Sequence, residues 1–158
     1  MEVSLENDYL LKMVIAFFIS IVPAYWASIV AHEYGHALVG RCCGLGIQKV
    51  DVSLTRAACY FVQDHRCDEL EYRPWARLFI ASAGAVANIL VIIGSLLLFA
   101  LDVEVGHVLG LFILLCVGFN CLAVLMVLLP SDDPQQDASR CREALRDIWY
   151  GVPPQASV

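Results

Sequence analysis

Three long stretches without any aspartate, glutamate, lysine or arginine constrain the fold of this chain more than any other feature of its sequence. They cover Met13–Ala31, Leu78–Leu101 and Val105–Pro130. A helix of about 20 apolar residues crosses the roughly 30 Å hydrocarbon core of a bilayer, and each stretch is about that long or longer. The sequence therefore predicts three transmembrane helices, at about residues 10–40, 76–101 and 105–130.

The overall composition agrees with a membrane location. Hydrophobic residues make up 59% of the 158 residues and charged residues 16%, whereas a soluble domain is about half apolar and about a quarter charged. The length allows a single domain, placed at residues 1–150, with a flexible tail at 151–158. The formal net charge of −6 offers no basic surface, which excludes nucleic acid as a partner. The seven cysteines form no CxxC pair and are interpreted as free thiols.

The distribution of positive charge predicts how the chain is oriented in the membrane. Of the 10 lysines and arginines, all but Lys12 lie between residues 40 and 77 or after residue 139. Because cytoplasmic loops are enriched in these residues, we expect a multi-pass membrane protein with its N-terminus outside and both basic segments in the cytoplasm. The alternative for the first stretch is a cleaved signal peptide, which should start with basic residues, whereas Glu2, Glu6 and Asp8 precede Lys12 here.

Two shorter elements are predicted outside the spans. Val50, Val52 and Leu54 alternate with polar residues, which predicts a small hairpin within residues 46–62 at the membrane surface. Near the C-terminus four apolar residues fall on one helical face: Cys141, Leu145, Ile148 and Trp149. This face predicts an amphipathic helix at about 138–149 on the inner leaflet. The expected fold class is an all-α membrane protein with three transmembrane helices, a small β-hairpin between the first two and a short C-terminal interfacial helix.

The motif His32-Glu33-Tyr34-Gly35-His36 stands at the cytoplasmic end of the first span. Two histidines four residues apart lie one turn from each other on one helix face, so both imidazoles can bind the same Zn²⁺. Glu33 is then placed to remove a proton from water at the metal. The alternative is that these are polar residues ending a helix at the headgroup level, but ionisable groups joined to a span are costly unless they have a function.

A third zinc ligand has to come from elsewhere in the chain, because catalytic zinc sites usually have three protein ligands and one open position. The first and third spans cross the membrane in the same direction, so their C-terminal ends emerge on the same face. The third ligand is therefore expected shortly after Pro130, where the acidic candidates are Asp132, Asp133 and Asp137. For the first two, the alternative is a solvated acidic turn around Pro134.

Three segments of the chain resemble, taken together, the motifs of one known protein family. His32–Leu38 reads HEYGHAL, Ala83–Asn88 reads AGAVAN, and Leu128–Pro130 is followed by Asp137–Arg140, which reads DASR. In order and approximate spacing they resemble the HExGHAL, AGPxAN and LLP…DGGR segments of the site-2 protease family of intramembrane zinc metalloproteases. The resemblance covers most of residues 10–142. It departs from the family where alanine replaces the proline of the second segment and where alanine and serine replace the glycines of the third.

The resemblance implies an activity and the residues that perform it. The activity is hydrolysis of a peptide bond within or near the transmembrane segment of a membrane-protein substrate, with Glu33 as the catalytic base. One Zn²⁺ per chain would be held by three ligands: His32, His36 and Asp137. Asn88 would hold the substrate carbonyl group, and the alternative for this residue is a hydrogen bond between helices.

Other classes of function are also compatible with the motif. A non-catalytic membrane protein that binds metal for structure, or an inactive relative of the proteases, would contain the same histidines. A transporter with an intramembrane metal site would have to form oligomers, because three spans are few to enclose a pathway. The sequence leaves the oligomeric state open.

The predicted hairpin adds an expectation about substrate binding. A membrane segment that unwinds for cleavage exposes backbone groups that are costly in lipid unless they are paired. We expect the edge strand Lys49–Leu54 to pair with them by strand addition, with Val50 and Val52 turned toward the membrane. The alternative is a plain surface hairpin.

Overall fold

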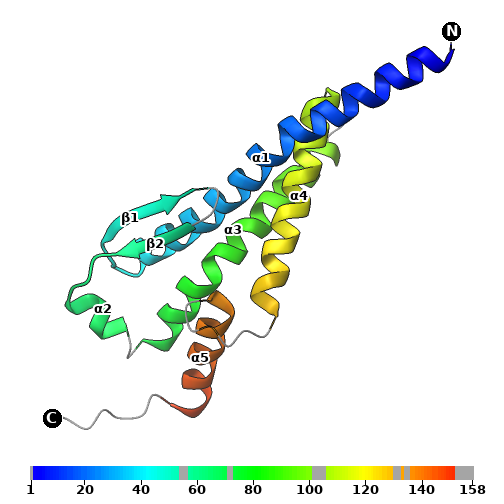
Figure 1. Cartoon of the computed structure of the whole chain (residues 1–158). Coiled ribbons are helices and arrows are strands. Elements are labelled where there is room, and N and C mark those ends of the chain that lie inside the picture. The colour runs from blue at the N-terminus through cyan, green and yellow to red at the C-terminus, as the bar shows by residue number, and fades with distance from the viewer. Residues whose placement is uncertain are drawn as a thin grey trace.

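The computed structural model describes residues 2–53, 57–70, 73–100, 106–129, 133 and 136–151. Its elements follow in the order α1 (Glu2–Cys42), β1 (Ile47–Val52), β2 (Ala57–Phe61), α2 (His65–Leu70), α3 (Pro74–Ala100), α4 (His107–Leu128) and α5 (Asp137–Tyr150) (Figure 1). Three long helices, a two-stranded antiparallel sheet and a short C-terminal helix confirm the predicted fold class. Apart from Gly151, the predicted tail lies outside the described residues.

Helices α1, α3 and α4 each contain a segment long and apolar enough to cross a membrane: Leu10–Cys42, Pro74–Leu98 and Val108–Leu128. Many of their large apolar side chains point outward, and Phe18, Leu90 and Leu114 are 68%, 63% and 61% exposed. So much exposed apolar surface is unusual for a soluble protein and is compatible with contact to lipid. Helices α1 and α4 run in the same direction, so their C-terminal ends lie at the same end of the bundle, as predicted (Figure 1).

The buried face of α1 is a stripe of small residues. Four positions at intervals of four are at most 7% exposed: Ala16, Ser20, Ala24 and Ser28. Small residues at this spacing let neighbouring helix backbones approach closely, which favours helix association in lipid. The next two positions of the stripe are His32 and His36. The face that packs α1 against α3 and α4 therefore also presents the two histidines.

Helices α1 and α3 come especially close beside the HExxH motif. A Cβ atom at Gly35 would lie 2.6 Å from the carbonyl oxygen of Ala83 and 2.8 Å from Cβ of Ala87. Both distances are far below ordinary van der Waals contact, so a larger residue at position 35 would push the helices apart. This contact places the motif directly against the Ala83–Asn88 segment of α3.

Strands β1 and β2 form an antiparallel hairpin in which Val50 pairs with Cys59 and Val52 pairs with Ala57. The hairpin predicted within residues 46–62 is thereby confirmed. It lies alongside the C-terminal part of α1 (Figure 1). The sequence did not predict α2, because its 6 residues are too few to show a helical period.

Helix α5 agrees with the predicted helix to one residue at each end, and the residues that it buries lie outside the predicted apolar face. Its buried residues are Ala138 and Ala144, whereas Trp149 is 82% exposed. An ion pair between Arg77 of α3 and Asp147 joins the two helices. The amphipathic pattern did not identify this contact, because alanines and an ion pair make it rather than large apolar side chains. Helix α5 therefore packs against the N-terminal half of α3 (Figure 1).

Candidate metal centre

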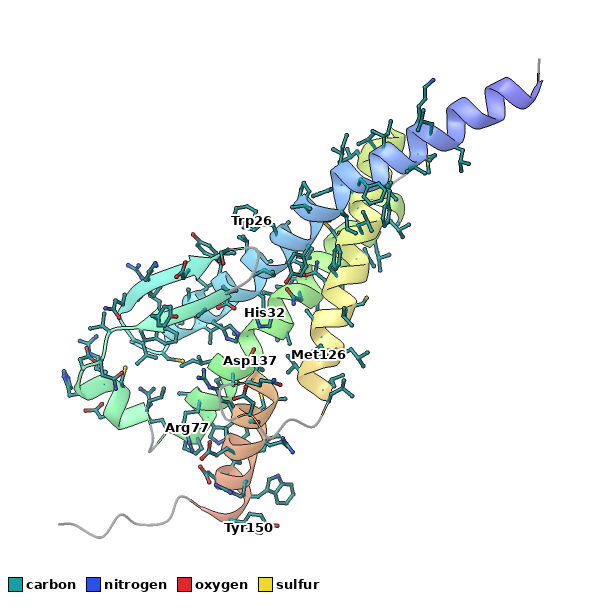
Figure 2. The ribbon with its side chains drawn as sticks, in the orientation of Figure 1. Trp26, His32, Arg77, Met126, Asp137 and Tyr150 are labelled. Atoms are coloured by element: carbon teal, nitrogen blue, oxygen red, sulfur yellow. The ribbon has the colours of Figure 1, made fainter. Side chains whose placement is uncertain are left out.

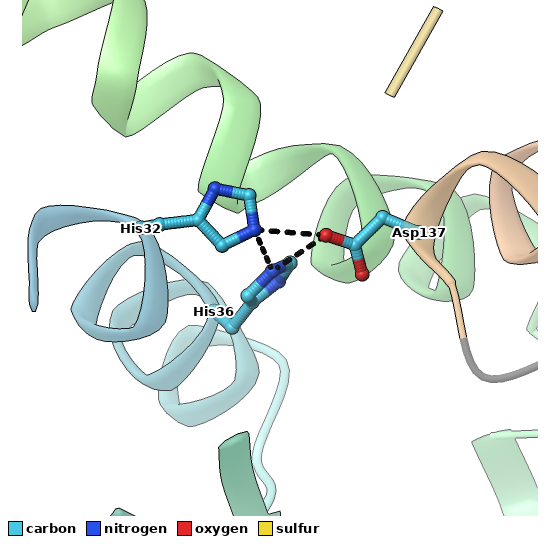
Figure 3. Close-up of side chains that lie close together, drawn as sticks. All are labelled: His32, His36 and Asp137. Atoms are coloured by element: carbon cyan, nitrogen blue, oxygen red, sulfur yellow. Dashed lines mark hydrogen bonds and ion pairs between the residues drawn. The ribbon is translucent and has the colours of Figure 1, made fainter. Parts of the chain in front are cut away.

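The two histidines of the HExxH motif turn their Nε2 atoms toward each other and toward the start of α5. These Nε2 atoms are 3.2 Å apart. Asp137, the first residue of α5, completes the group, because its Oδ2 lies 2.9 Å from Nε2 of His32 and 3.0 Å from Nε2 of His36 (Figures 2 and 3). Three potential ligand atoms thus converge from two helices that are far apart in the sequence.

The separations between these atoms fit a zinc site. Zinc binds histidine nitrogen and carboxylate oxygen at about 2.0–2.2 Å in tetrahedral geometry, which places neighbouring ligand atoms roughly 3.3 Å apart. The three atoms form a triangle with sides of 2.9, 3.0 and 3.2 Å. Two histidines and one carboxylate are a ligand set found at catalytic zinc sites, where the fourth position stays open.

Of the two acidic candidates within the described residues, Asp137 is the one that meets the histidines. Asp133 is exposed and outside this group, and Asp132 lies outside the described residues. Burial raises the pKa of Asp137, but the neighbouring His32 and His36 outweigh burial and hold that pKa well below its usual range. Asp137 is therefore a carboxylate, the form that binds metal ions.

The outer nitrogen of each histidine has a partner on α3. Nδ1 of His36 lies 2.7 Å from the carbonyl oxygen of Ile80, so Nδ1–H donates to that oxygen and Nε2 is free for a metal. Nδ1 of His32 lies 3.1 Å from Nδ2 of Asn88, while the buried Oδ1 of Asn88 has no partner. Rotation of the Asn88 side-chain amide by 180° exchanges the positions of Oδ1 and Nδ2. In that orientation Oδ1 accepts a hydrogen bond from Nδ1–H of His32. Such outer partners fix the tautomer and orientation of metal-binding histidines.

The contact between Asn88 and His32 is the interhelical hydrogen bond that was the alternative for this residue. Asn88 has no exposed surface, and its amide faces a ring nitrogen of α1. The structure thus makes Asn88 a positioning residue for His32. Its contact with a substrate carbonyl group stays a prediction.

Gly84, one turn before Asn88, is a site residue that the sequence did not single out. A Cβ atom at this position would lie 2.6 Å from Nε2 of His36 and closer still to Nε2 of His32. Any larger residue would occupy the space of the two imidazoles. The signal in the sequence was the spacing of Gly84 and Asn88, which places both on one face of α3.

Glu33 is buried, and its carboxylate accepts a hydrogen bond from the backbone N–H of Cys59 in β2. This contact ties the glutamate to the hairpin and holds it beside the histidines. Burial and then the negative charge of Glu33 raise the pKa of the Cys59 thiol. The thiol therefore stays protonated at neutral pH and does not compete for the metal.

A cavity of about 1550 Å³ joins these side chains. All the residues predicted for the site line it: His32, Glu33, His36, Asn88 and Asp137. One end lies between α1 and α4 and is mostly apolar, with the rings of Tyr25 and Phe119 in edge-to-face contact at a centroid distance of 5.5 Å. The other end lies beside α5 and is charged: Arg77, Arg140, Glu143, Arg146 and Asp147.

The hairpin strand at the cavity is β2 rather than the strand predicted from the sequence. Every residue of β2, Ala57–Phe61, lines the cavity, and the lining residues within the described part of the chain include none from β1. The prediction placed the substrate-binding edge at Lys49–Leu54, of which Leu54 lies outside the described residues. The alternation of Val50 and Val52 identified a strand but contained no information on which strand borders the cavity.

Comparison with family models, curated proteins and solved structures found no match to this chain. The three segments that resemble site-2 proteases nevertheless meet in space. His32–Leu38 contributes two histidines, Ala83–Asn88 contributes their glycine and amide neighbours, and Asp137–Arg140 contributes the carboxylate.

Proposed function

We propose that this chain is an intramembrane zinc metalloprotease of the site-2 protease type, which hydrolyses a peptide bond within or near the transmembrane segment of another membrane protein. The observation that supports the proposal is the convergence of His32, His36 and Asp137 in a cavity that also contains Glu33. Soluble metalloproteases with the HExxH motif use the same combination of two histidine ligands and a glutamate base.

The residues of the chain divide into ligands, a base and positioning residues. His32, His36 and Asp137 would hold the zinc ion, which supplies a Lewis acid that acidifies water and polarises a carbonyl group. Glu33 accepts a proton from the attacking water and returns it to the leaving amine. Asn88 orients His32 from the neighbouring helix.

The surroundings of the site favour a membrane-protein substrate. The apolar end of the cavity between α1 and α4 suits a hydrophobic segment. Backbone carbonyl groups of a membrane helix are hydrogen-bonded and must be freed before they can be attacked. We therefore expect preferred substrates to have Gly, Asn or Pro near the cleaved bond. The excess of positive charge in the loop and tail predicts that this site lies near the cytoplasmic face.

The test compares Glu33→Gln with Glu69→Gln, which removes the same charge from an exposed position of α2. Both proteins are purified, reconstituted in lipid vesicles and assayed for zinc content and for cleavage of a transmembrane peptide. We expect about one zinc ion per chain in both, because Glu33 is a base and not a ligand. Glu33→Gln should slow cleavage at least roughly 100-fold, and Glu69→Gln should not.

Two outcomes would contradict the proposal. Loss of zinc from the Glu33→Gln protein would mean that this glutamate is a ligand. An unsubstituted chain that binds zinc but cleaves no transmembrane peptide would be a non-catalytic metal-binding membrane protein. Removal of zinc with a chelator should abolish cleavage, and added zinc should restore it.

A further inference from the structure

The charged end of the cavity contains three arginines, and two of them have acidic partners. Arg77 pairs with Asp147 across α3 and α5. Arg146 lies 3.8 Å from Glu143 and 3.6 Å from Asp147. Among the described residues, Arg140 has no such partner. It is therefore the cavity arginine whose charge the described part of the chain leaves uncompensated.

The acidic groups that line the cavity are already engaged with other partners. Asp137 contacts the two histidines, and Glu33 accepts the N–H of Cys59. Glu143 and Asp147 have arginine partners. The described acidic residues that line the cavity thus leave the charge of Arg140 available to a carboxylate of a bound molecule.

Arg140 is close enough to the metal centre to act on a substrate there. It follows Asp137 by three positions on α5, and residues at this spacing share a helix face. Both residues line the cavity, and Arg140 is exposed. A substrate segment that fills the cavity displaces water from its guanidinium group, and a desolvated charge is costly without an opposite charge.

We propose that Arg140 binds a carboxylate of the substrate, so that the chain selects membrane segments with an aspartate or glutamate close to the cleaved bond. This inference rests on the proposed function. Helix α5 leads from Asp137 toward Tyr150 along the N-terminal part of α3 and so toward the end of that span (Figure 2). We therefore expect the acidic residue to lie where the substrate leaves its apolar segment. The guanidinium group of Arg140 lies about one helical turn and one side-chain length from the candidate metal centre. An extended substrate, at about 3.3 Å per residue, spans that distance in about three residues.

The experiment measures binding in the full-length Glu33→Gln protein, so it does not depend on cleavage. The probes are three synthetic peptides with about 20 leucine and alanine residues followed by Gly-Asn-Gly-X-Ser, in which X is Asp, Asn or Lys. We expect the Asp peptide to bind roughly tenfold more tightly than the Asn peptide, as for a charge-assisted hydrogen bond, and the Lys peptide to bind most weakly.

Substitution of Arg140 should change this order in a defined way. Arg140→Glu should reverse it, so that the Lys peptide binds best, and Arg140→Gln should equalise the Asp and Asn peptides. Zinc content shows that each variant is folded. Arg142→Glu makes the same change of charge at an exposed position of α5 that is not among the described cavity residues, and it should keep the preference for Asp.

Equal affinities for the three peptides, or an unchanged order in an Arg140→Glu protein that holds zinc, would overturn the inference. Failure of the proposed function has a different signature. In that case the chain with Glu33 intact cleaves none of the peptides, whatever their order of affinity. Charge-dependent binding without cleavage would support the carboxylate site and reject the protease.

Discussion

Asn88 and Asn120 are both completely buried, but their amides have different partners. Nδ2 of Asn120 donates to the carbonyl oxygen of Cys116 in the same helix, at 2.7 Å, whereas the amide of Asn88 contacts His32 in another helix. Asn88→Ala should lower zinc affinity about 10- to 100-fold, as loss of an outer partner does, and Asn120→Ala should leave it unchanged. Competition with a fluorescent chelator measures both affinities. Equal losses would mean that helix packing, not orientation of His32, is responsible.

The individual site residues differ in whether the sequence alone could reveal them. His32, Glu33 and His36 were predictable because their relation is local, set by the helical repeat of a single segment. Asp137 follows His36 by 101 positions, and it could be chosen among three aspartates only through the resemblance to a family. Gly84 was not predictable as an individual residue, because the need for glycine arises from imidazoles on another helix.

At the scale of elements, α5 positions the carboxylate of the candidate metal centre, and the pair of Arg77 and Asp147 joins α5 to α3. Asp147→Asn should lower stability by on the order of 2 kcal/mol, below the roughly 3–5 kcal/mol of a fully buried pair, because Arg77 is still partly exposed. Zinc affinity should fall with it. Lys49→Gln breaks an exposed pair with Asp51 and should have little effect. Thermal unfolding and zinc titration measure both changes, and an unaltered Asp147→Asn protein would show that alanine packing alone holds α5.

The hairpin gives a second prediction at this scale. The N–H of Cys59 points toward Glu33, so the N–H of Ala57, two residues earlier in β2, faces the same cavity edge. Val52 pairs with Ala57, and its N–H faces the opposite edge of the hairpin. If β2 receives the substrate by strand addition, Ala57→Pro should raise the KM for a transmembrane peptide, whereas Val52→Pro should not. Indistinguishable kinetics in the two zinc-loaded variants would exclude strand addition on β2.

At the scale of the whole molecule, three cysteines report on the orientation of the chain. Cys42, Cys59 and Cys141 belong to α1, β2 and α5, and positive charge in the flanking segments predicts that all three face the cytoplasm. A membrane-impermeant maleimide should leave them unlabelled in intact cells and label them after permeabilisation. Burial raises the pKa of the Cys59 and Cys141 thiols, so labelling is followed at alkaline pH, where more thiolate forms. Labelling of intact cells would place the metal centre on the outer side.

The general architecture could be predicted from the sequence because lipid permits few solutions. Uncharged stretches of sufficient length must be helices, and three successive spans cross a membrane in alternating directions. The contacts between elements could not be predicted, because Ala138, Ala144 and Gly35 are small residues that show no amphipathic pattern. Their importance appears only when the neighbouring helix is in place.

The long separation between His36 and Asp137 in the chain has a consequence for biosynthesis. During translation the HExxH motif is inserted into the membrane while the residues from α3 onward are still being made. The third ligand becomes available only after residue 137 has left the ribosome and α5 has docked on α3. On the proposed function, a chain that has not yet emerged as far as Asp137 therefore has no working protease site and cannot cleave the spans of other newly made proteins around it.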